Sequence, residues 1–125
     1  MDEITTDHAP ESIGPYSQGI RDGETVYVSG QGPIHPDSGD LIDADIAAQT
    51  ERTLENVAAI LDAAETSLDD VVKATVYLAD MDDYDAVNEV YGEYMSEPYP
   101  ARAAVEVAEF PIDIGVEIEV IATVQ

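Results

Sequence analysis

The chain is poor in cations and has no reactive sulfur. Its 125 residues include 28 Asp and Glu but only 4 Lys and Arg, and cysteine and tryptophan are both absent. Without cysteine the chain can form neither a disulfide nor a thiolate nucleophile, and it cannot bind zinc through sulfur. It also has no run of about 18 apolar residues, so the sequence predicts no transmembrane helix.

The net charge of −24 at pH 7 is extreme for a chain of this length. Nucleic-acid binding needs clustered Lys and Arg to contact phosphates, so this charge argues against a nucleic-acid partner. An acidic chain can be disordered, but here apolar residues recur periodically along nearly the whole length. Because concentrated salt screens repulsion between carboxylates, the scattered acids favour a halophilic source over an acidic protein from ordinary salt.

The N-terminal segment is acidic and polar, and it lacks the basic and apolar regions of a signal peptide. We therefore expect a cytoplasmic protein with no membrane partner. There is no linker and no low-complexity segment, so the length predicts one domain over residues 1–125.

Hydrophobic periodicity predicts five strands and two helices. The strands are expected at 17–21, 25–29, 71–78, 101–108 and 115–124, with a hairpin turn at Asp22-Gly23. The helices are expected at 45–64 and from about 80 to 95, the second capped by Asp80 or Asp82. The order β-β-α-β-α-β-β predicts an α+β fold in which both helices pack on one face of a single mixed sheet.

Arg102 is the cation whose position is most informative. The other three lie in acidic or polar surroundings that predict exposure to solvent: Arg21, Arg52 and Lys73. Arg102 lies in an apolar strand instead, and a guanidinium binds a carboxylate through two parallel hydrogen bonds. It therefore either forms a structural ion pair with Glu117 or Glu119, or binds the carboxylate of a substrate.

Alternation in the two closing strands predicts where Arg102 and Glu117 point. In the strand expected at 101–108, the more apolar row begins at Ala103, and we expect it to face the helices. In the strand expected at 115–124, the more apolar row is the one without Glu117, and we expect that row to face the helices too. We therefore expect Arg102 and Glu117 together on the sheet face that the helices leave open. That face would also carry apolar residues such as Ile121, so we expect it to contact another subunit.

Short motifs occur in a fixed order between about residues 8 and 124. They are 9–18 (APESIGPYSQ), 28–31 (VSGQ) with 36–39 (PDSG), Asn56, 88–91 (NEVY), and 100–102 (PAR) with 116–119 (VEIE). In order and spacing they resemble the motifs of the reactive-intermediate deaminases, also known as Rid or YjgF-like proteins. The resemblance implies a chorismate-mutase-like fold, a homotrimer whose sheets form a central barrel, and active sites in the clefts between subunits.

The resemblance also implies an activity. These proteins are hydrolytic deaminases, which convert the 2-imino and enamine acids released by pyridoxal-phosphate enzymes to 2-oxo acids and ammonia. The expected substrates are 2-iminobutanoate and 2-iminopropanoate. Arg102 would hold the substrate carboxylate, and Glu117 would position the attacking water and transfer protons. The remaining contacts to the substrate would come from Tyr16, Ser29, Gly30 and Asn88.

This chemistry requires neither a metal nor an organic cofactor, because a protonated imine is already electrophilic. One bidentate cation fixes the position of the C=N carbon, and a partly buried glutamate with a raised pKa can relay protons. Two alternatives stay open. One is a non-catalytic trimer that binds small carboxylates as a sensor or chaperone-like partner. The other is an endoribonuclease or translation inhibitor, which the shortage of cations disfavours.

Glu65 departs from the family pattern, which commonly has glycine after the first helix. The residue just past a helix end often needs a positive φ, which glycine adopts without strain. We expect this departure to affect how the helix ends and not what the protein does.

Overall fold

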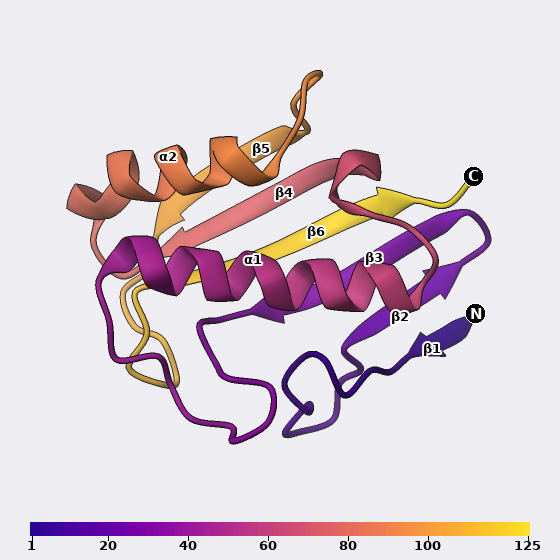
Figure 1. The fold of residues 1–125 in the computed structure, drawn as a ribbon, viewed down its shortest axis with the longest axis horizontal. Helices are drawn as coiled ribbons and strands as arrows, with labels where there is room; N and C mark the ends of the chain where they lie inside the picture. The colour runs from indigo at the N-terminus through magenta and orange to yellow at the C-terminus, as the bar shows by residue number, and fades with distance from the viewer.

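The computed structural model describes residues 1–125, and Figure 1 shows two helices lying on one side of a single sheet. The helices are α1 (Ile46–Ala63) and α2 (Tyr84–Tyr94), with short 3-10 turns at Leu68–Asp70 and Met81–Asp83. The strands are β1 (Asp2–Ile4), β2 (Gly19–Asp22), β3 (Thr25–Gln31), β4 (Val71–Leu78), β5 (Ala101–Glu106) and β6 (Val116–Thr123). The expected α+β class is confirmed.

The sheet is mixed, with strand order β1-β2-β3-β6-β4-β5. Only β4 and β5 pair in parallel, and α2 is the crossover that connects them. α1 lies over β3 and β6, and α2 lies over the edge of the sheet formed by β4 and β5 (Figure 1). β1 was not predicted, because three residues with one buried side chain, that of Ile4, give no alternating pattern.

The hydrophobic core fills the space between the sheet and the helices. Asp45 begins α1 by accepting a hydrogen bond from the Ala48 amide, and the apolar stripe of α1 is fully buried. In β6 the even-numbered residues are buried and the odd-numbered ones are half-buried, as the alternation predicts. Neither helix has the length and apolarity that a membrane span requires.

α1 ends in a Schellman motif that strains Glu65. The Thr66 amide donates to the Leu61 carbonyl and the Glu65 amide donates to the Asp62 carbonyl, both at 3.0 Å. Glu65 has a φ of 63°, the left-handed conformation that favours glycine. Glutamate in place of the family's usual glycine therefore causes local backbone strain, but α1 still ends in the hydrogen-bond pattern that glycine would allow.

Replacing Glu65 by glycine is expected to stabilise the protein by about 0.5–1 kcal/mol, because removing Cβ relieves more strain than the added freedom of the unfolded chain costs. Urea unfolding would measure the change. The exposed Glu55 in the middle of α1 is the matched control, and Glu55→Gly is expected to cost about 1 kcal/mol. A Glu65→Gly variant as unstable as Glu55→Gly would contradict the strain at Glu65.

The predicted orientation of β5 is wrong. Arg102 pairs with Ala74, which is fully buried beneath the helices, whereas Ala103 pairs with half-buried Thr75 on the other face. Arg102 therefore points to the helix side. β5 is an edge strand, and the row that faces the helices, with Arg102 and Glu106, is more polar than the opposite row, so alternation indicates the wrong face.

Glu117 lies on the open face, as predicted. It pairs with Tyr77 of β4, whose side chain also points away from the helices. Arg102 and Glu117 of one chain therefore lie on opposite faces of the sheet. The expectation that they share the open face is wrong.

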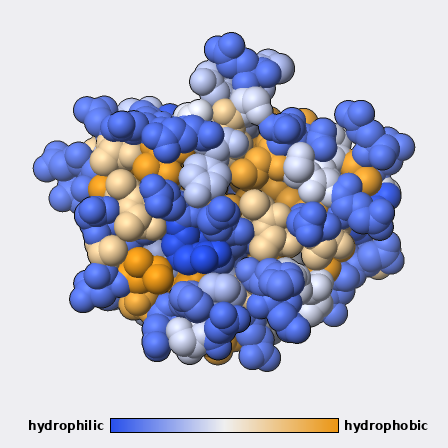
Figure 2. Space-filling model, in the orientation of Figure 1, coloured by the Kyte–Doolittle hydropathy of each residue, from blue (hydrophilic) through white to orange (hydrophobic).

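The open face is more apolar than its two glutamates suggest. Tyr27 is 48% exposed and Val105 is 41% exposed, and Ile121, which pairs with Tyr27, is half-buried. The helix-bearing face shown in Figure 2 carries mostly hydrophilic residues, with smaller apolar patches between them.

Candidate functional site

The site residues expected from the sequence form two clusters on opposite sides of the sheet. The arginine cluster lies where α2 covers β5. It consists of Arg102, Tyr84, Asn88 and Tyr91. The glutamate cluster lies on the open face, near the ends of β3 and β6. It consists of Glu117, Gly30, Ser29 and Tyr16.

The arginine cluster holds a guanidinium against two aromatic side chains. Tyr84, Asn88 and Tyr91 occupy positions i, i+4 and i+7 of α2, so they share one helix face. Arg102 Nη2 donates to the Tyr84 hydroxyl at 3.0 Å. The Arg102 Cζ atom lies 4.8 Å from the ring centroid of Tyr91 and 5.7 Å from that of Tyr84, within the range of cation–π attraction.

None of these partners is a carboxylate. The alternative in which Arg102 forms an ion pair with Glu117 or Glu119 is therefore wrong for the single chain, because both glutamates point from the other face of β6. Nη2 is the only guanidinium nitrogen with a hydrogen-bond partner, and Arg102 is half-buried. Nε and Nη1 remain available to an anion.

The electrostatics of the two tyrosines differ. The Asn88 side chain and the Arg102 guanidinium both stabilise the phenolate and lower the pKa of Tyr84. Burial raises the pKa of Tyr91, whose hydroxyl is buried without a hydrogen-bond partner. Tyr84 therefore contacts Arg102 through its hydroxyl, and Tyr91 contacts it through the ring alone.

In the glutamate cluster, the side chain of Glu117 packs against Gly30. A Cβ atom at Gly30 would lie 2.7 Å from Glu117 Oε2, so any side chain there would displace the carboxylate. A β-bulge places Ser29 and Gly30 opposite a single residue of β6, which allows this close approach. Burial raises the pKa of Glu117, and the charge of Glu119 raises it further.

A hydrogen bond holds Glu119 beside Glu117. The Tyr77 hydroxyl donates to Glu119 Oε1, and this bond is the main reason that the pKa of Tyr77 is raised to about 12. Tyr77 was not singled out in the sequence. The sequence shows only that Tyr77 is an aromatic residue in the more polar row of its strand. Its contact with Glu119 can be inferred only once β4 is known to pair with β6.

A cavity of about 470 Å³ opens beside Glu117. Tyr16 and Gly30 line it together with apolar residues, which are Ile13, Ile34, Leu41, Ile112 and Ile114. The Tyr16 side chain is 52% exposed, and its hydroxyl accepts a hydrogen bond from the Ile13 amide at 3.4 Å. The lining contains two carboxylates, Glu11 and Glu117, and no cation, so the cavity alone is only part of a site for an anionic substrate.

Ser29 and Asn56 hold the backbone around this cavity. Ser29 Oγ donates to the Ser17 carbonyl at 2.6 Å, which fixes the segment that carries Tyr16 against β3. Buried Asn56 donates to the carbonyls of Gly32 and Ile34 and accepts from Arg52. Arg52 is therefore partly buried, with its Nε enclosed, and the predicted full exposure is wrong for this residue.

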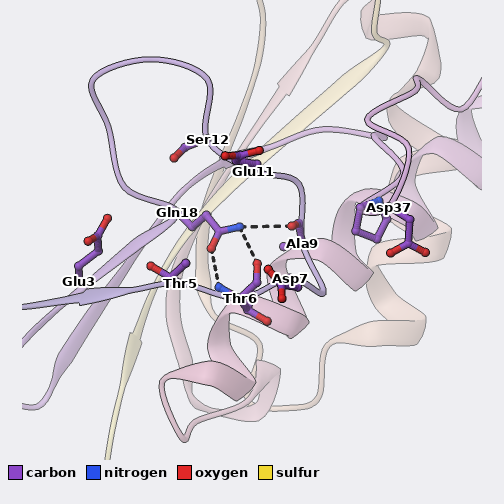
Figure 3. Close-up of a pocket in the computed structure, with 10 residues that line it drawn as sticks. Glu3, Thr5, Thr6, Asp7, Ala9, Glu11, Ser12, Gln18 and Asp37 are labelled. Carbon is purple, nitrogen blue, oxygen red and sulfur yellow. Dashed lines mark hydrogen bonds between the residues drawn. The ribbon is translucent and has the colours of Figure 1, made fainter.

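A second hollow, of about 510 Å³, lies near the N-terminus and is unsuited to an anion. Its lining is polar and acidic and includes no Lys or Arg. Figure 3 shows Gln18 at its centre, where the amide donates to the backbone carbonyls of Thr6 and Ala9 and accepts from the Thr6 amide. Gln18 therefore ties the N-terminal loop together. Elsewhere, no group of three or more His, Cys, Asp or Glu is placed to hold a metal ion.

Comparison with known proteins assigns the family. The model of the family described as Endoribonuclease L-PSP matches residues 6–124. A RutC family protein of Pyrococcus horikoshii is 53% identical over 119 residues, which cover 95% of this chain and 94% of the relative. The 2-iminobutanoate/2-iminopropanoate deaminase of Escherichia coli is 44% identical over 122 residues, with the same coverage. The chain belongs to the Rid family.

Solved structures agree with this family assignment. The crystal structure of RidA from the Antarctic bacterium Psychrobacter sp. has a TM-score of 0.95 and 47% identity, and the match covers 99% of this chain and 100% of that one. The structure of E. coli TdcF with bound serine has a TM-score of 0.94 and 41% identity over the whole of both chains. The Rid fold has the mixed sheet and paired helices expected from the sequence.

Proposed function

We propose that this Rid protein is a hydrolytic deaminase that converts 2-iminobutanoate and 2-iminopropanoate to the corresponding 2-oxo acids and ammonia. The observation that carries the proposal is the environment of Arg102. In a chain with 28 acids and 4 cations, this guanidinium contacts two aromatic rings and a hydroxyl, and it keeps donors free. A relative 44% identical to this chain is named for the same reaction.

The complete site requires two copies of the chain. Arg102 and Glu117 lie on opposite faces of one sheet, so they do not converge on one small substrate within a chain. In our proposal, the copies form a closed homotrimer through the open faces, and Arg102, which lies on the edge strand β5, meets the Glu117 cavity of the next copy at the margin of this contact. The exposed apolar side chains of Tyr27 and Val105 support contact through that face.

The reaction then follows from the two clusters. Arg102 binds the carboxylate of the 2-imino acid and fixes the position of C2. Glu117 accepts a proton from water as its oxygen adds to C2 of the protonated imine, giving a carbinolamine. Glu117 then gives this proton to the nitrogen and accepts the hydroxyl proton as the C–N bond breaks, so that ammonia and the 2-oxo acid leave and Glu117 finally releases the proton to water. Burial suits Glu117 to this exchange, because it raises the pKa toward neutral pH.

A coupled assay tests the proposal. A threonine dehydratase supplies the enamine of 2-iminobutanoate, which hydrolyses slowly in water. The purified protein, at a concentration far below that of the intermediate, is expected to speed the appearance of 2-oxobutanoate and of ammonia in equal amounts. Unchanged rates at all protein concentrations would show that the protein is no deaminase for this substrate.

A non-catalytic carboxylate-binding protein is the second candidate. The relative solved with bound serine favours it, because serine is a small carboxylate. This candidate predicts binding of 2-oxobutanoate without any increase in hydrolysis rate. An endoribonuclease, named in the description of the family, is disfavoured by the net charge of −24, because RNA binding relies on contacts between cations and phosphates.

A further inference from the structure

Tyr84 is a member of the arginine cluster with no role in the reaction proposed above. It is the first residue of α2, and it contacts Arg102 in two ways, through its ring and through its hydroxyl. The hydroxyl accepts from Nη2 at 3.0 Å, so the hydrogen bond lies near the plane of the guanidinium. Among the contacts of Arg102, it is the only hydrogen bond.

The two aromatic contacts constrain different motions of Arg102. Contact with Tyr91, whose ring centroid lies 4.8 Å from Cζ, holds the guanidinium over that ring. This contact bonds to no particular nitrogen, so it leaves the group free to turn. The hydrogen bond from Nη2 to Tyr84 removes this freedom and determines which of the guanidinium N–H groups point outward.

We propose that Tyr84 is a positioning residue for carboxylate recognition, and that its hydroxyl sets the direction in which Arg102 presents its free donors to the substrate. The inference rests on the proposed function, because it takes the carboxylate of a 2-imino acid as the ligand of Arg102. Bidentate binding of a carboxylate depends on that direction, since both hydrogen bonds form only when the fork and the carboxylate share a plane.

The surroundings of the hydroxyl support this role. Asn88, one turn further along α2, stabilises the phenolate together with Arg102, and the two lower the pKa of Tyr84. The nearby charge of Asp85 opposes them. The phenol oxygen therefore has a defined acceptor role toward Arg102. Tyr91 offers no such acceptor, because its hydroxyl is buried and has no partner.

Tyr84→Phe tests the inference, because it removes the hydroxyl and keeps the ring. We expect KM for 2-iminobutanoate to rise about tenfold, the size of losing one hydrogen bond to a charged group, with kcat within about twofold of the wild type. The dissociation constant of 2-oxobutanoate, measured by calorimetry, should rise by the same factor. In an Arg102→Lys background, Tyr84→Phe should raise neither KM nor the dissociation constant any further, because an ammonium has no planar pair of donors to orient.

Tyr94→Phe is the matched control. Tyr94 is half-buried on the same helix and has no contact with Arg102, so its KM, kcat and Tm should equal those of the wild type. An unchanged KM and an unchanged 2-oxobutanoate affinity in Tyr84→Phe would overturn the inference. So would a parallel fall in kcat and Tm, which would show a structural role.

The outcomes also separate this inference from the proposed function. If the wild-type protein binds 2-oxobutanoate without turnover, the deaminase proposal fails, and the affinities of Tyr84→Phe and Tyr94→Phe still decide the role of Tyr84. If the wild-type protein binds no carboxylate, both proposals fail.

Discussion

Arg102→Ala is expected to abolish the acceleration of imine hydrolysis, with a fall in kcat/KM of about a hundred- to a thousandfold, as when one partner of a charged, hydrogen-bonded pair is removed. Arg102 is the only cation in either cluster, so no other side chain can take over the substrate carboxylate. Arg102→Lys keeps the positive charge but loses the planar guanidinium, and its kcat/KM should fall between those of Arg102→Ala and the wild type. The dehydratase-coupled assay measures all three proteins.

Arg21→Ala is the control for this prediction. Arg21 lies in β2, pairs with Val26 and donates to the Gly23 carbonyl at 3.0 Å, and it belongs to neither cluster. The Arg21→Ala substitution removes one positive charge, as Arg102→Ala does, but leaves the proposed site intact, so the kcat/KM of this variant should match that of the wild type. Equal losses in Arg21→Ala and Arg102→Ala would attribute the effect to net charge, and an active Arg102→Ala would remove the basis of the proposed substrate binding.

Glu117→Gln is expected to lower kcat by about a hundredfold or more, because amide oxygen cannot exchange protons with water and the leaving nitrogen. The pH profile gives the sharper result. The ionised carboxylate is the active form, so activity should rise with pH through the pKa of Glu117, which burial raises above that of an ordinary glutamate. Glu117→Gln should lose this acidic limb.

Glu119→Gln provides the second half of the pH test. The charge of Glu119 raises the pKa of Glu117, so its removal should move the acidic limb to lower pH while the enzyme stays active. Exposed Glu109 is a control for a lost carboxylate elsewhere, and Glu109→Gln should leave the profile in place. A limb that moves to higher pH in Glu119→Gln would contradict the assigned electrostatics.

The parts of the fold that were predicted are those with a clear buried face. β4, β6 and α1 each have one apolar row or stripe against the core, and periodicity finds such elements. β5 was found, but its orientation was reversed. The row with Arg102 and Glu106 faces the helices although it is the more polar one, and the position of β5 at the sheet edge leaves Val105 exposed on the other face. Only pairing with β4 decides that Arg102 lies beneath α2.

The family resemblance names candidate site residues, but it does not give their arrangement in this chain. The contact between Glu117 and Gly30 depends on a bulge where two strands from opposite ends of the chain pair. The sequence alone gives Tyr84 and Tyr91 no functional signal, because an aromatic stripe at helical spacing is typical of a core. Their role emerges only once Arg102 is placed against that stripe.

The central claim is that a guanidinium from one copy works with a carboxylate from another, and mixing two inactive variants tests it most directly. Arg102→Ala and Glu117→Gln chains are unfolded together in equal amounts, refolded, and assayed against each variant refolded alone. Random assembly puts an intact Arg102 opposite an intact Glu117 in about one quarter of the sites, so the mixture should regain about a quarter of wild-type activity. A mixture no more active than its two components, although it has assembled, would show that the two residues do not act across copies.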